Sequence, residues 1–456
     1  MRRVRIHDTL SGQVREIEPR EPGSVGIYAC GPTVYARVHV GNARPFVVFA
    51  LLKRLLEHEG YEVTLVENIT DVNDKIYAAA SAQGVGSEAL AREMTAAYVE
   101  DTDRLGLGRP DHEPKASETI PAIVSLIEDL IEGGHAYEAG GDVYFAVDEF
   151  EGYGRLSNRP REEMQQGEAD DAAALKRAPR DFALWKTAKA GEDTSWDSPW
   201  GRGRPGWHIE CSAMAEEILD LDFDLHGGGS DLVFPHHENE IAQTEAARGR
   251  PLARVWMHNG MVQMGAEKMA KSVGNIRLLH AALDEYGHEA LLMWLVAAHY
   301  RQPVSFGEAA LRQARATVRG LRELCRRLEV DAPAAGGMDE VAERFFDALA
   351  DDFNTPAACA VLFDWVAEAN RSLDAGQRLG PGRLGEMLHA LGLEGLLAAA
   401  ADGDGAPEDV RLLADRREKA RAERDFAAAD RLRDELAERG WEIRDTPDGA
   451  RLVRCE

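Results

Sequence analysis

The first 70 residues contain two short apolar runs separated by one long apolar segment. Residues 25–30 (Val-Gly-Ile-Tyr-Ala-Cys) indicate a buried strand. A loop containing Gly-Pro follows, and residues 43–59 predict a helix that ends at Gly60. Residues 61–69 predict a second strand that leads into Thr70. Strand, loop, helix and strand in this order open a doubly wound parallel-sheet (Rossmann-type) α/β fold, whose ligands bind at the carboxyl ends of the strands.

The pattern changes between residues 140 and 200. Helices are expected at about 86–103 and 117–133, but the following stretch holds only short strands such as 143–147, many Gly and Pro residues, and an acidic segment around 168–171. We interpret it as an insertion between two halves of the nucleotide-binding fold. The second half is expected to resume near Trp207.

The C-terminal part is helical in pattern from about 278 to 400, and Asn354-Thr355-Pro356 is a typical helix start because proline suits the first turn. After a linker, residues 407–439 predict one highly charged helix, followed by a hairpin around Thr-Pro-Asp-Gly. We therefore expect a catalytic domain with an insertion, then an α-helical bundle and a small mixed α/β C-terminal domain. The expected units are residues 1–135 (first half of the catalytic domain), 136–204 (insertion), 205–261 (second half), 262–310 (a loop-containing region), 311–400 (helical bundle) and 407–456 (charged helix and hairpin).

Composition is that of a globular protein, since 44% of the 456 residues are hydrophobic and 29% are charged. The longest strictly apolar run, residues 290–298, is too short to span a bilayer, and the N-terminus shows no export signal. We therefore expect a cytoplasmic protein without membrane association. The net charge of −27 argues against non-specific nucleic-acid binding, which depends on Lys and Arg. A polyanionic partner would have to bind a local basic face.

Four residues that are distant in the sequence have the side chains of a zinc site: Cys30, Cys211, His236 and Glu240. His236 and Glu240 lie on one face if their segment is helical, because they are four residues apart. His237 is an alternative to His236. Buried cysteines and surface histidines without a metal are the other interpretation. The remaining cysteines are expected to be small core or surface residues, and they are Cys325, Cys359 and Cys455.

His39-Val40-Gly41-Asn42 lies where the first loop meets the first helix. A helix N-terminus presents unpaired N–H groups to phosphate. His39 can donate to phosphate oxygens, and Gly41 leaves room for an adenine face. A capped helix start with an incidental histidine is the alternative.

Two further motifs suit a nucleotide. Lys268 and Lys271 lie in one short loop, where ammonium groups suit the charge that develops on pyrophosphate. Gly229 and Asp231 follow an apolar stretch, so that the glycine allows close backbone approach and the aspartate can accept from ribose hydroxyls or a substrate amine. A solvated lysine pair and an ordinary loop are the respective alternatives.

With these residues in place, the chain resembles a class I cysteinyl-tRNA synthetase from end to end. The matching blocks are Tyr-Ala-Cys-Gly-Pro-Thr-Val-Tyr (28–35), Asn-Ile-Thr-Asp-Val-Asn-Asp-Lys-Ile (68–76), Pro-Gly-Trp-His-Ile-Glu-Cys-Ser-Ala-Met (205–214), the segment from Gly-Gly-Gly-Ser-Asp to Ile-Ala-Gln (227–243), Asp-Phe-Asn-Thr-Pro (352–356) and Asp-Phe-Ala-Ala-Ala-Asp (425–430). Two positions depart from the class pattern: Asn42 stands where a second histidine is usual, and Ala270 where serine is usual.

The resemblance implies that L-cysteine is activated with Mg²⁺-ATP and transferred to tRNA(Cys) by a monomer. It implies one Zn²⁺ per chain that binds the substrate thiol, with Thr70, Trp207 and His236 lining the cysteine pocket. It assigns catalysis to His39, Asn42, Lys268 and Lys271, and ATP binding to Gly41, Gly229, Asp231 and Lys271. Residues 262–310 would contact the tRNA stem, and residues 311–400 and 407–456 would bind the tRNA and its anticodon.

Two other functions stay open at this point. A related enzyme makes cysteinyl adenylate and transfers cysteine to an amino sugar, but such an acceptor requires no charged C-terminal module. A non-catalytic RNA-binding or zinc-structural protein is the third possibility, against which His39 and both lysines argue.

Overall fold

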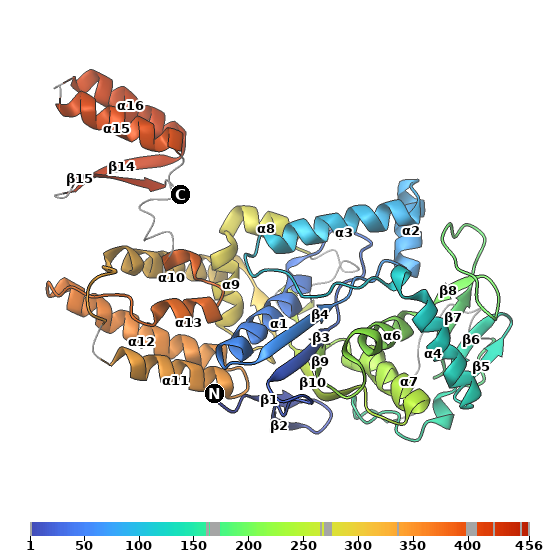
Figure 1. Cartoon of the computed structure of the whole chain (residues 1–456). Helices are drawn as coiled ribbons and strands as arrows, with labels where there is room; N and C mark the ends of the chain where they lie inside the picture. The colour runs from blue at the N-terminus through green and yellow to red at the C-terminus, as the bar shows by residue number, and fades with distance from the viewer. Residues whose placement is uncertain are drawn as a thin grey trace.

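The computed structural model describes residues 2–160, 164, 174–264, 267–268, 276–334, 337–397, 408–422, 425–446 and 449–454. Its centre is a four-stranded parallel sheet in the order β10-β9-β3-β4 (Figure 1). The strands are β3 (Ser24–Ala29), β4 (Glu62–Glu67), β9 (Phe223–Gly229) and β10 (Ala253–Asn259). All neighbouring pairs are parallel, so their carboxyl ends share one edge. The doubly wound α/β prediction is confirmed.

Helices cover both faces of this sheet. On one side α1 (Val40–His58) connects β3 to β4, and on the other lie α6 (Trp207–Leu219) and α7 (Glu238–Arg248). The helix predicted from residue 43 begins earlier, at Val40, because His39 has extended backbone angles and forms its N-cap. Two helices follow β4, α2 (Asp74–Gln83) and α3 (Ser87–Asp103), and α2 ends at Gly84 in the left-handed region.

The stretch interpreted as an insertion contains a separate antiparallel sheet. Its order is β5 (Ala136–Ala139), β6 (Asp142–Phe145), β7 (Phe182–Thr187) and β8 (Gly203–Pro205), and α4 (Ile120–Glu132) contacts β5. A second hydrophobic core lies here, which includes Phe145, Phe182 and Trp185. Short 3₁₀ turns form at Ala116–Glu118 and Val147–Glu149. The acidic segment 168–171 lies outside the described residues.

Two small sheets flank the central one. An N-terminal hairpin of β1 (Arg5–Asp8) and β2 (Gln13–Glu16) contacts β10. A three-stranded sheet in the order β12-β11-β13 consists of β11 (Val262–Met264), β12 (Glu267–Lys268) and β13 (Val304–Phe306).

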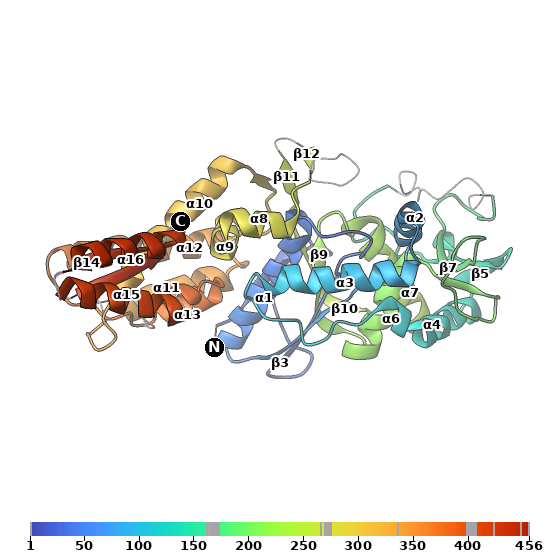
Figure 2. The ribbon, with the colours of Figure 1, turned by 90° about the horizontal axis from the view of Figure 1, so that it is seen from above.

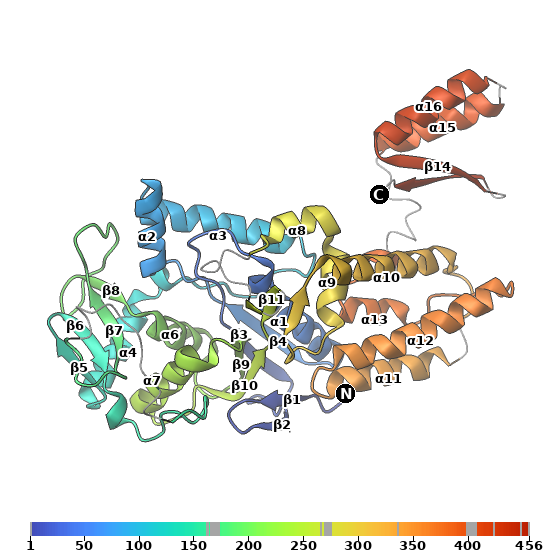
Figure 3. The same ribbon diagram turned by 180° about the vertical axis from the view of Figure 1, so that it is seen from behind.

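Helices fill the region after residue 278. They are α8 (Leu279–Tyr286), α9 (His288–Val296), α10 (Glu308–Arg327), α11 (Met338–Ala350), α12 (Thr355–Asp374) and α13 (Leu384–Ala390). The predicted helix start at Asn354 is confirmed, since its side chain accepts from the Ala357 N–H. Figure 2 shows α8 beside the end of α3. Arg104 and Asp284 join the two helices by an ion pair. Figure 3 shows the bundle on the opposite side of the sheet from the insertion.

The C-terminal unit corrects one prediction. The single charged helix expected at 407–439 is two helices, α15 (Glu408–Ala422) and α16 (Phe426–Glu438), which pack against each other. Asp425 begins the second helix because its carboxylate accepts from the Ala428 N–H. The predicted hairpin is present as β14 (Trp441–Thr446) and β15 (Gly449–Arg454). None of the helices in the described ranges combines the length and hydrophobicity that crossing a membrane would require.

Candidate active site and metal centre

The carboxyl ends of the parallel strands meet in closely packed loops. Cys30 follows β3, and its N–H donates to the Gly227 carbonyl of β9 at 2.9 Å. Glycines make this approach possible, because a Cβ on Gly31 would lie 1.9 Å from the Asn68 carbonyl oxygen, and one on Gly227 would lie 2.3 Å from the ring of Phe49. The sheet edge therefore brings the backbone of three strands to one point.

Four side chains from separate elements converge beside Cys30. They are Cys30 itself, Cys211 of α6, His236 in a π-helical turn (Val233–His237) and Glu240 of α7, and their ligand atoms all lie within 4.8 Å of one another. His236 Nε2 lies 3.0 Å from Glu240 Oε1. All four residues are buried. The structure thus brings together the set expected to bind zinc, and the alternative of surface histidines does not hold.

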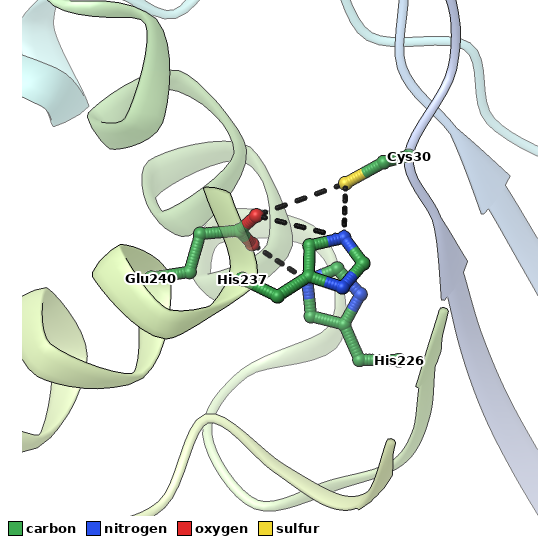
Figure 4. Close-up of side chains that lie close together, drawn as sticks. All are labelled: Cys30, His226, His237 and Glu240. Atoms are coloured by element: carbon green, nitrogen blue, oxygen red, sulfur yellow. Dashed lines mark hydrogen bonds and ion pairs between the residues drawn. The ribbon is translucent and has the colours of Figure 1, made fainter. Parts of the chain in front are cut away.

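A second set overlaps the first. Cys30, His226, His237 and Glu240 also place their ligand atoms within 4.8 Å of one another (Figure 4). His237 Nε2 is 3.3 Å from Cys30 Sγ, and His226 Nε2 is 2.6 Å from Glu240 Oε2. Sequence reasoning had named His237 as an alternative ligand but missed His226. The signal in the sequence was His226 itself, a histidine at the end of the apolar stretch that leads to Gly227.

The ionisation of the two thiols is unequal. A hydrogen bond from Cys30 and the nearby His236 lower the pKa of the Cys211 thiol to about 6, whereas burial raises the pKa of Cys30. Burial also opposes protonation of His236, but the negative charges of Glu240 and Cys211 outweigh this effect and raise its pKa. These contacts favour the thiolate form of Cys211, which is the form that binds a metal.

Each imidazole is also fixed through its other nitrogen. His236 Nδ1 lies 3.0 Å from His208 Nδ1, and His237 Nδ1 lies 2.7 Å from His258 Nε2. His226 Nδ1 donates to the Tyr28 carbonyl at 3.2 Å. Such contacts fix ring orientation and tautomer, as they do around metal ligands. Burial lowers the pKa of His208 and of His237, so both rings are neutral.

The residues expected to line the cysteine pocket lie next to this cluster. Trp207, the first residue of α6, stacks on His236 with ring centroids 4.4 Å apart. Thr70 follows β4 and is buried, and its Oγ1 accepts from Asn68 Nδ2 at 3.2 Å. The Val34 N–H donates to the Thr70 carbonyl, which ties the loop after Cys30 to the end of β4.

The first nucleotide motif forms the start of α1. The Asn42 side-chain oxygen accepts from the His39 N–H at 3.2 Å. Gly41 makes room for a protein group, because a Cβ there would lie 2.9 Å from the His39 ring. Gly229 ends β9, and a Cβ on it would lie 2.5 Å from the Asp231 carboxylate.

The second nucleotide motif is only partly described. The backbone of Lys268 belongs to β12, where it pairs with Gln263. The Lys268 side chain, Ala270 and Lys271 lie outside the described residues. Cys325 and Cys359, expected in the core or at the surface, are both buried, and Cys455 is outside the described residues.

Comparisons with known proteins agree with this geometry. Residues 16–316 match the family model described as "tRNA synthetases class I (C) catalytic domain", and residues 344–393 match a DALR domain. A cysteine–tRNA ligase from Halorhodospira halophila is 46% identical over 99% of both chains. The chain belongs to the cysteine–tRNA ligase family. A second member, from Heliobacterium modesticaldum, is 44% identical over 99% of this chain and 100% of its own.

Solved structures support the fold of this family member. The methionyl-tRNA synthetase of Mycobacterium tuberculosis in complex with methionyl-adenylate superimposes with a TM-score of 0.62 at 16% identity, over 83% of this chain and 89% of that one. The similarity covers the fold alone at this identity. This cysteine–tRNA ligase family member therefore has the Rossmann-type architecture of class I synthetases.

Proposed function

We propose that this chain activates L-cysteine with ATP and transfers it to tRNA(Cys), and that one Zn²⁺ held by Cys30, Cys211, His236 and Glu240 selects the amino acid. One observation carries the metal assignment: two thiols, an imidazole and a carboxylate from four elements meet at the ligand-binding edge of a parallel sheet. Family membership and near-complete coverage of curated relatives support the reaction.

The two overlapping ligand sets differ in thiolate content. The proposed set contains two cysteines, Cys30 and Cys211, whereas the other set contains Cys30 alone, and soft sulfur ligands favour zinc. In this assignment His226 and His237 act as neighbours that hold the ligands. His226 Nε2 lies 2.6 Å from Glu240 Oε2, and His237 contacts Cys30.

Bound zinc would supply selectivity, because it deprotonates a coordinating thiol and prefers its sulfur to the hydroxyl oxygen of serine. The protein's share is to shape the pocket. Trp207 holds the His236 ring by stacking, and Thr70 is buried after the end of β4. Size alone would reject serine by only about 1–3 kcal/mol, so a pocket without metal would discriminate poorly.

Adenylate formation is assigned to the start of α1 and the lysine segment. The N-terminus of α1 has the positive dipole that would favour a bound phosphate group. His39, Asn42, Lys268 and Lys271 would stabilise the charge that develops as the cysteine carboxylate attacks the α-phosphate of Mg²⁺-ATP and pyrophosphate leaves. Gly41, Gly229 and Asp231 would contact the nucleoside.

Transfer to tRNA is assigned to residues 262–310, the bundle and the C-terminal unit. Several arginines of α15 and α16 pair with neighbouring acids, such as Arg433 with Asp430 at 3.2 Å, so part of this charge belongs to a salt-bridged helix surface. The amino-sugar alternative is not favoured, because cysteine–tRNA ligases match the chain along 98–99% of its length, including this unit. The monomeric state and cytoplasmic location stay predictions from the sequence.

The test measures ATP–pyrophosphate exchange with cysteine and with serine, then charging of total tRNA. We expect cysteine-dependent exchange, at least a hundredfold weaker exchange with serine, charging of one tRNA acceptor, and one zinc per chain. Cys211→Ser should lose zinc and cysteine affinity together, whereas Cys325→Ser, another buried cysteine, should keep both. Exchange without charging would support the amino-sugar reaction. Full activity in Cys211→Ser without zinc would refute the selection mechanism.

A further inference from the structure

Arg44 is a buried cation two residues after Asn42 on α1. Its side chain is 1% exposed, and burial lowers its pKa to about 10. Within the described residues its guanidinium meets main-chain carbonyls and forms no ion pair. A buried charge requires such compensation, so these carbonyls fix where the side chain lies.

The four carbonyls belong to two chain segments that border β11 and β13. Arg44 Nη1 donates to Gly260 at 2.6 Å and to Met261 at 3.2 Å, immediately before β11. Its Nη2 donates to Gln302 at 2.7 Å and to His299 at 3.3 Å, shortly before β13. The planar guanidinium thus joins two segments through one side chain.

The two segments also pack closely against each other through their backbones. The Gly260 N–H donates to the Tyr300 carbonyl at 2.8 Å, and a Cβ on Gly260 would lie 2.5 Å from the Gln302 carbonyl oxygen. The Val304 N–H donates to Met261 at 3.0 Å and starts the β11–β13 pairing. Arg44 therefore adds hydrogen bonds from one side chain to carbonyls of both segments, next to the backbone hydrogen bonds that already join them.

The same small sheet positions Lys268. Gln263 of β11 pairs with Lys268 of β12. Beyond this segment the chain returns to α1, because the Val40 N–H donates to the Arg277 carbonyl at 2.9 Å and the Leu279 N–H donates to the Val38 carbonyl at 3.0 Å. The chain is thus attached to the beginning of α1 both before and after Lys268.

We propose that Arg44 is a positioning residue for adenylate formation, which holds β11, and through it Lys268, in place relative to His39 and Asn42. The inference rests on the proposed function, which gives these residues their role in the reaction. A lysine at position 44 keeps the charge but presents one ammonium where the guanidinium reaches two carbonyl pairs. A displacement of about 1 Å at reacting groups can lower a rate roughly 100-fold.

Arg54 offers a matched control on the same helix. It is 9% exposed and donates to the carbonyls of His389, Gly106 and Leu107 at 2.8, 3.3 and 3.3 Å, and to Glu394. It lies ten residues further along α1, and in the part of the chain that the structure describes its hydrogen bonds reach neither β11 nor the residues assigned to catalysis. Changes at Arg54 therefore report the general effect of removing a buried arginine from α1.

The experiment compares Arg44→Lys, Arg44→Met, Arg54→Lys and Arg54→Met with the parent protein. Cysteine-dependent ATP–pyrophosphate exchange is measured per titrated active site, together with zinc content and Tm. We expect kcat to fall roughly 10- to 100-fold in Arg44→Lys. Its KM for cysteine should stay within about twofold and its zinc at one per chain. The Arg54 variants should lose Tm but keep kcat per active site.

Arg44→Lys is the decisive variant, because Arg44→Met removes the Arg44 hydrogen bonds to all four carbonyls and can fail to fold. Equal kcat per active site in Arg44→Lys and Arg54→Lys would overturn the inference, as would a parallel loss of zinc and cysteine affinity in Arg44→Lys. Absence of cysteine-dependent exchange in the parent protein would instead refute the proposed function.

Discussion

The indole of Trp207 lies on the imidazole of His236, with ring centroids 4.4 Å apart and an angle of 11° between the planes. Trp207 starts α6, the helix that also carries Cys211, and His236 belongs to the turn before α7. The stack therefore connects two of the elements that provide proposed zinc ligands. It also places an aromatic wall beside the proposed metal site.

The stack predicts a graded response at Trp207. A stacked aromatic pair contributes about 0.5–1.5 kcal/mol beyond its buried area. Trp207→Leu should therefore raise the KM for cysteine roughly 2- to 13-fold, and Trp207→Phe should restore most of the affinity. Steady-state exchange at varied cysteine concentration provides the measurement. Trp200→Leu, which changes an aromatic residue of the insertion, is the control and should leave this KM unchanged.

The two overlapping ligand sets predict different outcomes for adjacent histidines. If His236 is the ligand, His236→Ala should lose zinc and His237→Ala should keep one zinc per chain with at most a 10- to 100-fold weaker affinity, as for residues that orient ligands. Metal analysis after dialysis against graded chelator concentrations distinguishes them. Zinc retained in His236→Ala but lost in His237→Ala would assign the metal to the set that contains His226.

Glu67 predicts a pH dependence of stability. Burial raises its pKa to about 7, although a hydrogen bond from Tyr98 opposes the shift. An unfolded glutamate has a pKa near 4.3, so the folded state holds the proton more tightly. The stabilisation of the folded state by protonated Glu67 is fully present below about pH 4.3 and is lost as pH rises through about 7.

Glu67→Gln should remove this dependence. The variant should match the parent in stability near pH 4 and exceed it above pH 7.5, by at most about 4 kcal/mol in unfolding free energy. Thermal unfolding at several pH values tests this. A constant Tm difference between pH 5 and pH 8 would mean that Glu67 does not titrate in this range.

The close packing around Gly31 predicts that any side chain at this position would destabilise the protein. A Cβ at this position would lie 1.9 Å from the Asn68 carbonyl oxygen, a contact that only backbone movement relieves. Gly31→Ala should therefore displace Cys30 or the end of β4, destabilise the protein by several kcal/mol and lower cysteine-dependent exchange. Gly320→Ala, in the middle of α10 with open space around it, should instead stabilise the protein by about 0.5–1 kcal/mol.

Much of the secondary structure of this protein can be predicted from the local sequence pattern. The strand before Cys30, the helix that ends near Gly60, the strand before Thr70 and the helix start at Asn354 are all in the structure because burial periodicity and capping act over a few residues. The split of the charged C-terminal helix was missed. Charge runs on through Asp425, and only its side-chain cap marks the break.

Both the sequence and the tertiary structure were needed to describe the proposed metal site. The sequence supplied the donor types and the four-residue spacing of His236 and Glu240, and the family resemblance supplied the full set of four. Only the tertiary structure shows that His226 contacts the second carboxylate oxygen of Glu240. The same holds for Arg44, which joins the segments before β11 and β13. Contacts between residues some 14 to 258 positions apart leave no periodic trace in the sequence. They are decided by which strands pair and how closely their ends pack.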